Sequence, residues 1–200
     1  YLSVTPTVQC DGTFKCLVNP FTQLYMFHAV LGNGVSYPML YCLVKGKSQE
    51  LYVRLLRLVE DIGARANKPI FGRQVNVMID FELAFVNALR QYEAGRTVIC
   101  CFFHFVSNLR KKSVKIMARI RRAAGERSAK MSMARLTKRS LMMLPLLPKE
   151  LITTALVDAI VARFDAAFPE SAGAFTKLRD HIVRNYVAPN ARFPLTTWCV

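Results

Sequence analysis

Short runs of apolar and β-branched residues, separated by turn signals, occupy the first quarter of the chain. Residues 7–14, 23–30 and 36–44 each form such a run, and a Gly-Asn-Gly segment at 32–34 separates the second from the third. Runs of this composition, bounded by turn residues, are typical of strands. The short connections predict that the three strands pair antiparallel.

The pattern then changes from strand to helix and back. Residues 48–66 begin at Ser48, a good N-cap, and predict a helix; residues 75–79 predict a strand, 81–92 a short helix and 97–103 a fifth strand. The apolar face expected for the first helix consists of Leu51, Leu55, Leu58, Val59 and Ile62. Because a helix precedes it, the strand at 75–79 must lie parallel to the first. The order β-β-β-α-β-α-β predicts an α/β fold with a mixed sheet.

After His104 the pattern is helical throughout. Apolar residues recur at helical spacing, Pro145 and Pro148 interrupt them, and Pro189 ends the last helix. We therefore expect an α/β core over residues 1–104, an all-helical insertion over 105–190 after the fifth strand, and the start of a further segment over 191–200.

Charge changes this picture most in the insertion. The chain carries a net charge of +15, and the stretch 110–139 holds twelve Lys or Arg against one acid, Glu126. A stripe this basic favours a polyanionic partner, because each neutralised phosphate releases counterions; a solvated helix face is the alternative. The candidate DNA-binding residues are Arg110, Lys111, Lys112, Lys115, Arg119 and Arg122.

Other classes of protein fit the composition poorly. No apolar run approaches the length needed to cross a bilayer, which argues against a membrane partner. The six cysteines lie mostly inside apolar runs without paired spacing, so we expect reduced thiols in an intracellular compartment. The chain does not begin with Met, and we expect it to be a fragment.

Two acidic residues close strand patterns that are far apart in the sequence. Asp11 follows the apolar part of the first run, and Asp80 follows the run Val75 to Ile79 directly. Two neighbouring carboxylates repel each other, and a bound divalent cation would offset this repulsion. Carboxylates are hard oxygen ligands, which favour Mg²⁺ or Mn²⁺. A role as a turn residue or helix cap is the alternative, for Asp80 above all.

The motifs together resemble the transposase domain of Mutator-like elements, the MULE family. The resemblance spans essentially the whole chain, and it implies an RNase H-like fold and a DDE-type DNA transposase. Such an enzyme is a polynucleotidyl transferase that uses an Asp, Asp, Glu triad and divalent metal to cut transposon ends and join them to target DNA. By residue match, Asp11 is the first acid and Asp80 the second; the resemblance also implies a nuclear location. The matching residues are Asp11-Gly12-Thr13-Phe14, Pro20, Gln23-Leu24-Tyr25, His28, Pro38, Tyr41, Lys47, Tyr52, Asp80-Phe81-Glu82, Ala84, Ala88, Cys101, His104, the segment 144–148, Phe193-Pro194 and Trp198.

We expect the third acid of the triad to be missing from this chain. In the family the Glu follows a Trp-containing segment like that around Trp198, and the chain ends at Val200. We therefore expect a catalytic fragment that binds DNA and does not cleave it alone. The alternative is a transposase-derived DNA-binding or regulatory protein without cleavage activity. The oligomeric state stays open, a homo-oligomer included.

The remaining motif is Cys101-x-x-His104. The sequence leaves three roles open: a core strand end, a group near the active site, or part of a zinc site, which would need further ligands. Strand periodicity predicts Cys101 and Phe103 on one face and Phe102 and His104 on the other. For Glu82 we expect a role at the start of the helix that follows Asp80.

Overall fold

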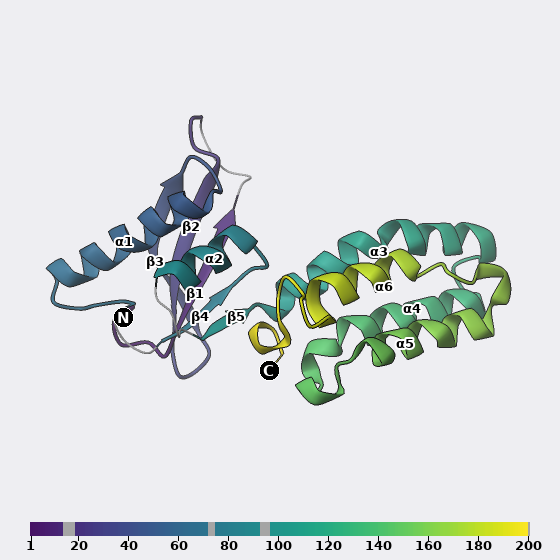
Figure 1. Cartoon of the computed structure of the whole chain (residues 1–200). Helices are drawn as coiled ribbons and strands as arrows, with labels where there is room; N and C mark the ends of the chain where they lie inside the picture. The colour runs from purple at the N-terminus through teal and green to yellow at the C-terminus, as the bar shows by residue number, and fades with distance from the viewer. Residues whose placement is uncertain (14–18, 72–74, 93–96, 200) are drawn as a thin grey trace. The chain divides into compact units, whose positions relative to one another are not determined.

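A computed structural model describes residues 1–13, 19–71, 75–92 and 97–199 of the chain. Phe14 of the Asp-Gly-Thr-Phe motif, Cys16 and Val200 lie outside the described residues. The chain divides into two compact units, residues 1–101 and 102–200, and each is described by itself (Figure 1).

The first unit is built on a five-stranded mixed sheet. Its strands are β1 (Thr7–Thr13), β2 (Gln23–Val30), β3 (Ser36–Val44), β4 (Asn76–Ile79) and β5 (Val98–Cys100), in the spatial order β3-β2-β1-β4-β5. The first three pair antiparallel, and β4 lies parallel to both β1 and β5. The predicted α/β fold, element order and parallel pairing of the first and fourth strands are confirmed.

Helices α1 (Gln49–Arg65) and α2 (Leu83–Tyr92) supply the core of this unit. Ser48 caps α1 by accepting a hydrogen bond from the backbone N–H of Leu51, as predicted. Tyr52 of α1 and Phe85 of α2 pack against Tyr25 of β2, with ring centroids 4.8–5.6 Å apart. Both helices thus contact the same face of the sheet.

The predicted apolar face of α1 is partly wrong. Leu55 and Val59 are buried, whereas Leu58 and Ile62 are 55% and 46% exposed. The buried face is instead rotated towards Tyr52, Val53 and Leu56, because the polar pattern of this helix leaves room for more than one apolar stripe.

The fifth strand is shorter than its apolar run. The prediction of a strand over residues 97–103 is wrong at its end, since β5 stops at Cys100 and helix α3 begins at Phe102. The apolar run therefore serves two elements, and periodicity cannot distinguish a buried strand from the first turn of a helix within it. The expected placement of Phe102 and Phe103 on opposite faces of a strand is wrong for the same reason.

The second unit is helical. A turn at Gly125, whose φ is +82°, separates α3 from α4, and Thr153 caps α5. The bounds of its elements are α3 Phe102–Ala124, α4 Ala129–Met142, η1 Leu144–Leu146, η2 Lys149–Leu151, α5 Thr154–Ala167, η3 Pro169–Ser171, α6 Thr176–Ile182, η4 Val183–Val187 and η5 Leu195–Thr197.

An aromatic cluster closes one end of the helical unit. The Trp198 ring stacks on Phe105 of α3 at 5.1 Å, and its indole N–H lies 3.0 Å from the carbonyl of Phe193. Tyr186 packs edge-on against both rings. Residues 193–198 therefore pack within the helical unit, through Trp198.

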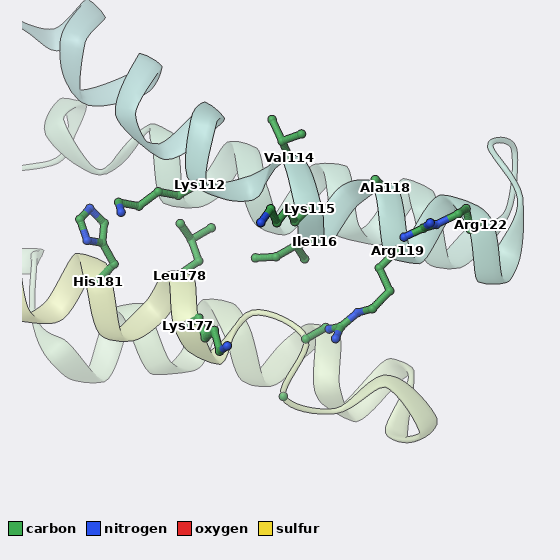
Figure 2. Close-up of a pocket in the computed structure, with 12 residues that line it drawn as sticks. Lys112, Val114, Lys115, Ile116, Ala118, Arg119, Arg122, Lys177, Leu178 and His181 are labelled. Atoms are coloured by element: carbon green, nitrogen blue, oxygen red, sulfur yellow. The ribbon is translucent and has the colours of Figure 1, made fainter.

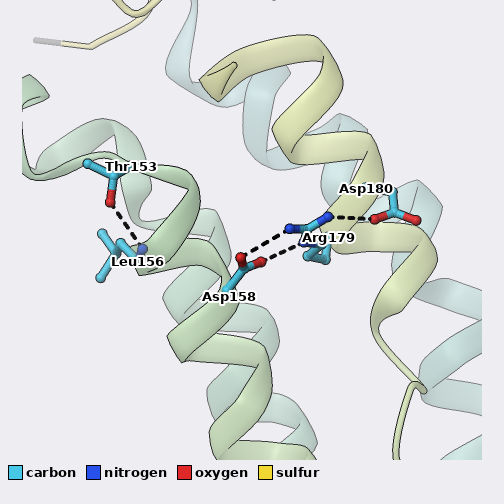
Figure 3. A network of polar contacts seen from close by, with 5 residues as sticks. All are labelled: Thr153, Leu156, Asp158, Arg179 and Asp180. Atoms are coloured by element: carbon cyan, nitrogen blue, oxygen red, sulfur yellow. Dashed lines mark hydrogen bonds and ion pairs between the residues drawn. The ribbon is translucent and has the colours of Figure 1, made fainter. Parts of the chain in front are cut away.

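An ion pair connects α5 and α6 (Figure 3). The Arg179 guanidinium donates through Nε to Asp158 Oδ1 at 2.6 Å and through Nη2 to Oδ2 at 3.1 Å. Its Nη1 reaches Asp180 at 3.0 Å. This bidentate geometry fixes the relative position of the two helices.

Within the described residues, no helix is both long and apolar enough to span a bilayer.

Candidate acidic site and basic groove

The sheet register brings the two predicted acids to the same level. In the parallel pair of β1 and β4, Gln9 lies opposite Met78. Asp11 stands two residues after Gln9 on β1, and Asp80 stands two residues after Met78, directly after the end of β4. If the register continues beyond Gln9 and Met78, the two acids are neighbours. Neighbouring strands lie about 4.8 Å apart, a spacing at which two carboxylates can share one cation.

The surroundings of the pair are half-buried and negatively charged. Asp11 and Asp80 are each partly exposed, while Cys10, between them and the core, is 2% exposed. Burial raises the pKa of the Cys10 thiol well above its usual value, and the charges of Asp80 and Asp11 raise it further. Both carboxylates thus act on the same thiol, as expected for acids at adjacent strand ends.

Asp80 also shapes the start of α2. Its Oδ1 accepts the backbone N–H of Glu82 at 3.1 Å, two residues further on, which is the contact of a turn residue, one of the two predicted alternatives for Asp80. Glu82 is the residue whose carbonyl accepts the first bonds of α2, as expected. The Glu82 side chain is used differently, because its Oε1 lies 2.8 Å from the Tyr52 hydroxyl.

Asp11 and Asp80 supply two hard oxygen donors. Among the residues that the structure describes, no group of three or more His, Cys, Asp or Glu side chains could hold a metal ion. The donor set therefore fits a divalent cation held by two carboxylates and completed by ligands from elsewhere, such as water or substrate.

The sequence of this unit matches a known family. The family model of the MULE transposase domain matches residues 7–108, from β1 into the first turns of α3. The chain belongs to the MULE transposase domain family. No curated protein matches the chain significantly.

The MULE match includes the Cys-x-x-His motif. Cys101 directly follows β5, and His104 lies in the first turn of α3. Both side chains are partly exposed. The role of the motif, whether structural, near the site or in zinc binding, stays a prediction.

The helical unit of the MULE protein contains a basic groove between α3 and α6 (Figure 2). Its volume is about 790 Å³, and its floor is apolar, with Ile116 and Leu178 facing each other. Four cations come from one face of α3, spaced three or four residues apart, and Lys177 comes from α6. The full lining is Lys112, Val114, Lys115, Ile116, Ala118, Arg119, Arg122, Gly173, Ala174, Lys177, Leu178 and His181.

Four of the six candidate DNA-binding residues line this groove, namely Lys112, Lys115, Arg119 and Arg122. Arg110 and Lys111 are exposed on α3 but do not line it. Arg110 acts instead on Lys138 of α4: burial lowers the pKa of Lys138, and Arg110, Arg139 and Arg135 lower it further. The stripe thus divides between two sides of α3.

The acids of the helical unit neutralise other cations. Glu126 pairs with Arg121 and Arg135, and Glu170 with Lys130. None of the Lys or Arg that line the groove forms an ion pair within the described residues. The cations that line the groove are therefore left for a ligand.

Lys177 and His181 were not among the predicted DNA-binding residues, because they lie more than fifty residues after the end of α3. Burial, with the positive charges of Lys112, Arg184 and Arg192, lowers the pKa of His181 to about 4. Its Nδ1 lies 3.0 Å from the Asn185 amide nitrogen. Its Nε2 is buried and has no hydrogen-bond partner among the described residues.

Proposed function

We propose that residues 1–101 form the catalytic core of a Mutator-like DNA transposase, with an RNase H-like fold and Asp11 and Asp80 as two carboxylates of a DDE-type site. The observation that supports the proposal is the parallel register of β1 and β4, which pairs Gln9 with Met78, two residues before Asp11 and two residues before Asp80. The strand order β3-β2-β1-β4-β5 and the family match support it.

Asp11 and Asp80 would hold Mg²⁺ or Mn²⁺ through oxygen atoms. A bound divalent ion in such a site activates an attacking oxygen and neutralises charge on a phosphodiester. The chain's own contribution is placement: β1 and β4 bring the carboxylates to one sheet edge, and the Asp80 contact with Glu82 fixes the turn after β4.

The substrate is DNA, transposon ends and target alike, and the helical unit contributes affinity. The groove between α3 and α6 offers four cations of α3 and Lys177 to phosphates, with no acid in its lining. Contacts of this kind bind DNA without reading its sequence. A substrate of this kind also suits a nuclear location.

Residues 1–200 alone would bind metal and DNA without cleaving. Two carboxylates are fewer than the triad that the family resemblance implies, and the described residues supply no third ligand beside them. A transposase-derived protein that binds DNA and never cleaves is the alternative. Nicking of supercoiled plasmid by the 1–200 chain in Mn²⁺ would contradict both.

The proposal is tested by Mn²⁺ affinity, measured by electron paramagnetic resonance of the free ion. We expect Asp11→Asn and Asp80→Asn each to weaken Mn²⁺ binding at least tenfold, since either change removes one of two charged ligands. Asp61→Asn, which removes an exposed charge from α1, is the matched control and should bind as the unaltered chain does. Equal affinity in all four proteins would refute the acidic site.

A further inference from the structure

A chain of buried polar groups runs beneath the acidic site. The Tyr52 hydroxyl of α1 lies 2.9 Å from Gln23 Oε1 on β2 and 2.8 Å from Glu82 Oε1 at the start of α2. Tyr52 and Gln23 are fully buried. Three elements that are distant in sequence thus meet at one hydroxyl group.

The proton count at Tyr52 fixes how these groups are arranged. A phenol hydroxyl donates one proton, and both neighbours are acceptor oxygens. The Gln23 Nε2 group is meanwhile buried and has no partner among the described residues. Rotating the Gln23 amide by half a turn exchanges its oxygen and nitrogen, so that Nε2 donates to Tyr52 and Tyr52 donates to Glu82 Oε1.

One end of this series of polar groups bonds to the proposed metal ligand Asp80, and the other end contacts the residue next to the proposed ligand Asp11. At one end, the backbone N–H of Glu82 donates to Asp80 Oδ1. At the other end, a Cβ built on Gly12 would lie 2.1 Å from Gln23 Nε2, so the amide rests against the backbone next to Asp11. The absence of a side chain at Gly12 is what admits Gln23.

The geometry points to Tyr52 as a positioning residue of the acidic site, acting through Gln23 beside Asp11 and through Glu82 beside Asp80. This inference rests on the proposed function, because it assumes that the two acids bind a metal ion. Partners behind metal ligands fix ligand orientation, and their loss costs about 10- to 100-fold in metal affinity.

The test compares two Tyr→Phe variants of the 1–200 chain in Mn²⁺ titrations. Tyr52→Phe keeps the ring and removes the hydroxyl, and we expect it to weaken Mn²⁺ binding about tenfold. Tyr25→Phe is the matched control: its ring lies 5.6 Å from that of Tyr52, and its buried hydroxyl has no partner among the described residues. It should bind Mn²⁺ within twofold of the unaltered chain.

Glu82 variants keep the inference testable if Tyr52→Phe does not fold. Glu82→Gln retains an oxygen that can accept from Tyr52, whereas Glu82→Ala removes it; both lose the same charge. We expect Glu82→Ala to bind Mn²⁺ several-fold more weakly than Glu82→Gln.

Three results separate the inference from the proposed function. A folded Tyr52→Phe variant with unchanged Mn²⁺ affinity overturns the positioning role while leaving the site intact. With Tyr52→Phe unfolded, equal affinities of the two Glu82 variants overturn it as well. Unchanged binding by Asp80→Asn would instead refute the metal site itself.

Discussion

The two units of this MULE protein place charge in opposite ways. In residues 1–101 two acids follow paired positions of neighbouring parallel strands, and Tyr52 and Gln23, which are buried, bond to each other. In residues 102–200, eighteen Lys and Arg face six Asp and Glu, a net charge of +12, and the excess lies along helix faces open to solvent.

This difference in charge placement indicates how each unit could act. Two neighbouring carboxylates repel each other and therefore attract a cation more strongly than one carboxylate does. Unpaired cations along a groove attract an extended polyanion, and this attraction depends little on the exact position of each side chain. Small changes in position should therefore impair the first unit, and only changes in charge should impair the second.

The largest expected effect is on DNA binding through the groove. Reversing Lys112, Lys115, Arg119 and Arg122 to Glu should reduce DNA affinity at low salt by at least about 100-fold. It should also lower the slope of log affinity against log salt by about 3 to 4, because up to four phosphate contacts are lost. Fluorescence anisotropy over a salt series measures both quantities.

A control of equal charge change sharpens this comparison. Reversing Arg54, Arg57, Lys149 and Arg163, which are exposed outside the groove, alters net charge by the same amount. It should leave most of the affinity in place. Equal losses in the two quadruple variants would show that net charge, and not the groove, binds DNA.

The next effect concerns geometry in the first unit. Gly12→Ala should lower the free energy of unfolding by about 1–3 kcal/mol, because its Cβ would overlap the buried Gln23 amide. Gly32→Ala is the control, since nothing lies within 4 Å of its Cβ. Urea denaturation distinguishes the two; equal stability would mean that Gln23 moves aside without cost.

The smallest effect is expected at the Asp158–Arg179 pair of the second unit. The hydrogen bond from Arg179 lowers the pKa of Asp158, so the folded state favours the ionised carboxylate. That stability is present above the carboxyl's unfolded pKa and is lost as pH falls through the lowered value. Because the pair is solvent-exposed, Asp158→Asn should cost less than about 1 kcal/mol at pH 7.

The pH dependence provides the check on that prediction. The stability difference between Asp158→Asn and the unaltered chain should shrink as the pH is lowered below about 4, the ordinary range of an Asp carboxyl. Urea denaturation at several pH values measures it. A difference that is constant with pH would assign the effect to packing and not to charge.

The local part of the fold could be predicted from the sequence. Alternation and turn residues marked β1 to β3, and Ser48 marked the start of α1, because these signals act within a few residues. The end of β5 could not be predicted, since its apolar run continues into the first turn of α3. The choice of buried face in α1 depends on the rings of Tyr25 and Phe85, which lie elsewhere in the sequence.

The candidate site divides in the same manner. Asp11 and Asp80 could be proposed because each follows an apolar run, and the cations of α3 because they cluster. The sequence could not predict that Lys177 contributes to the groove or that Tyr52 contributes to the acidic site. Each contribution depends on a contact between segments that are distant in the sequence. In the sequence, Tyr52 was named only among the residues that carry the family resemblance.

The central claim, that Asp11 and Asp80 share a cation at one edge of the sheet, is tested most directly by locating Mn²⁺. Paramagnetic broadening of amide resonances in the 1–200 chain reports which residues lie near the ion. We predict the strongest broadening at residues 9–12 and 78–82 together, with both sets lost in Asp80→Asn. Broadening confined to residues 102–199, or to one of the two strands alone, would contradict the shared site.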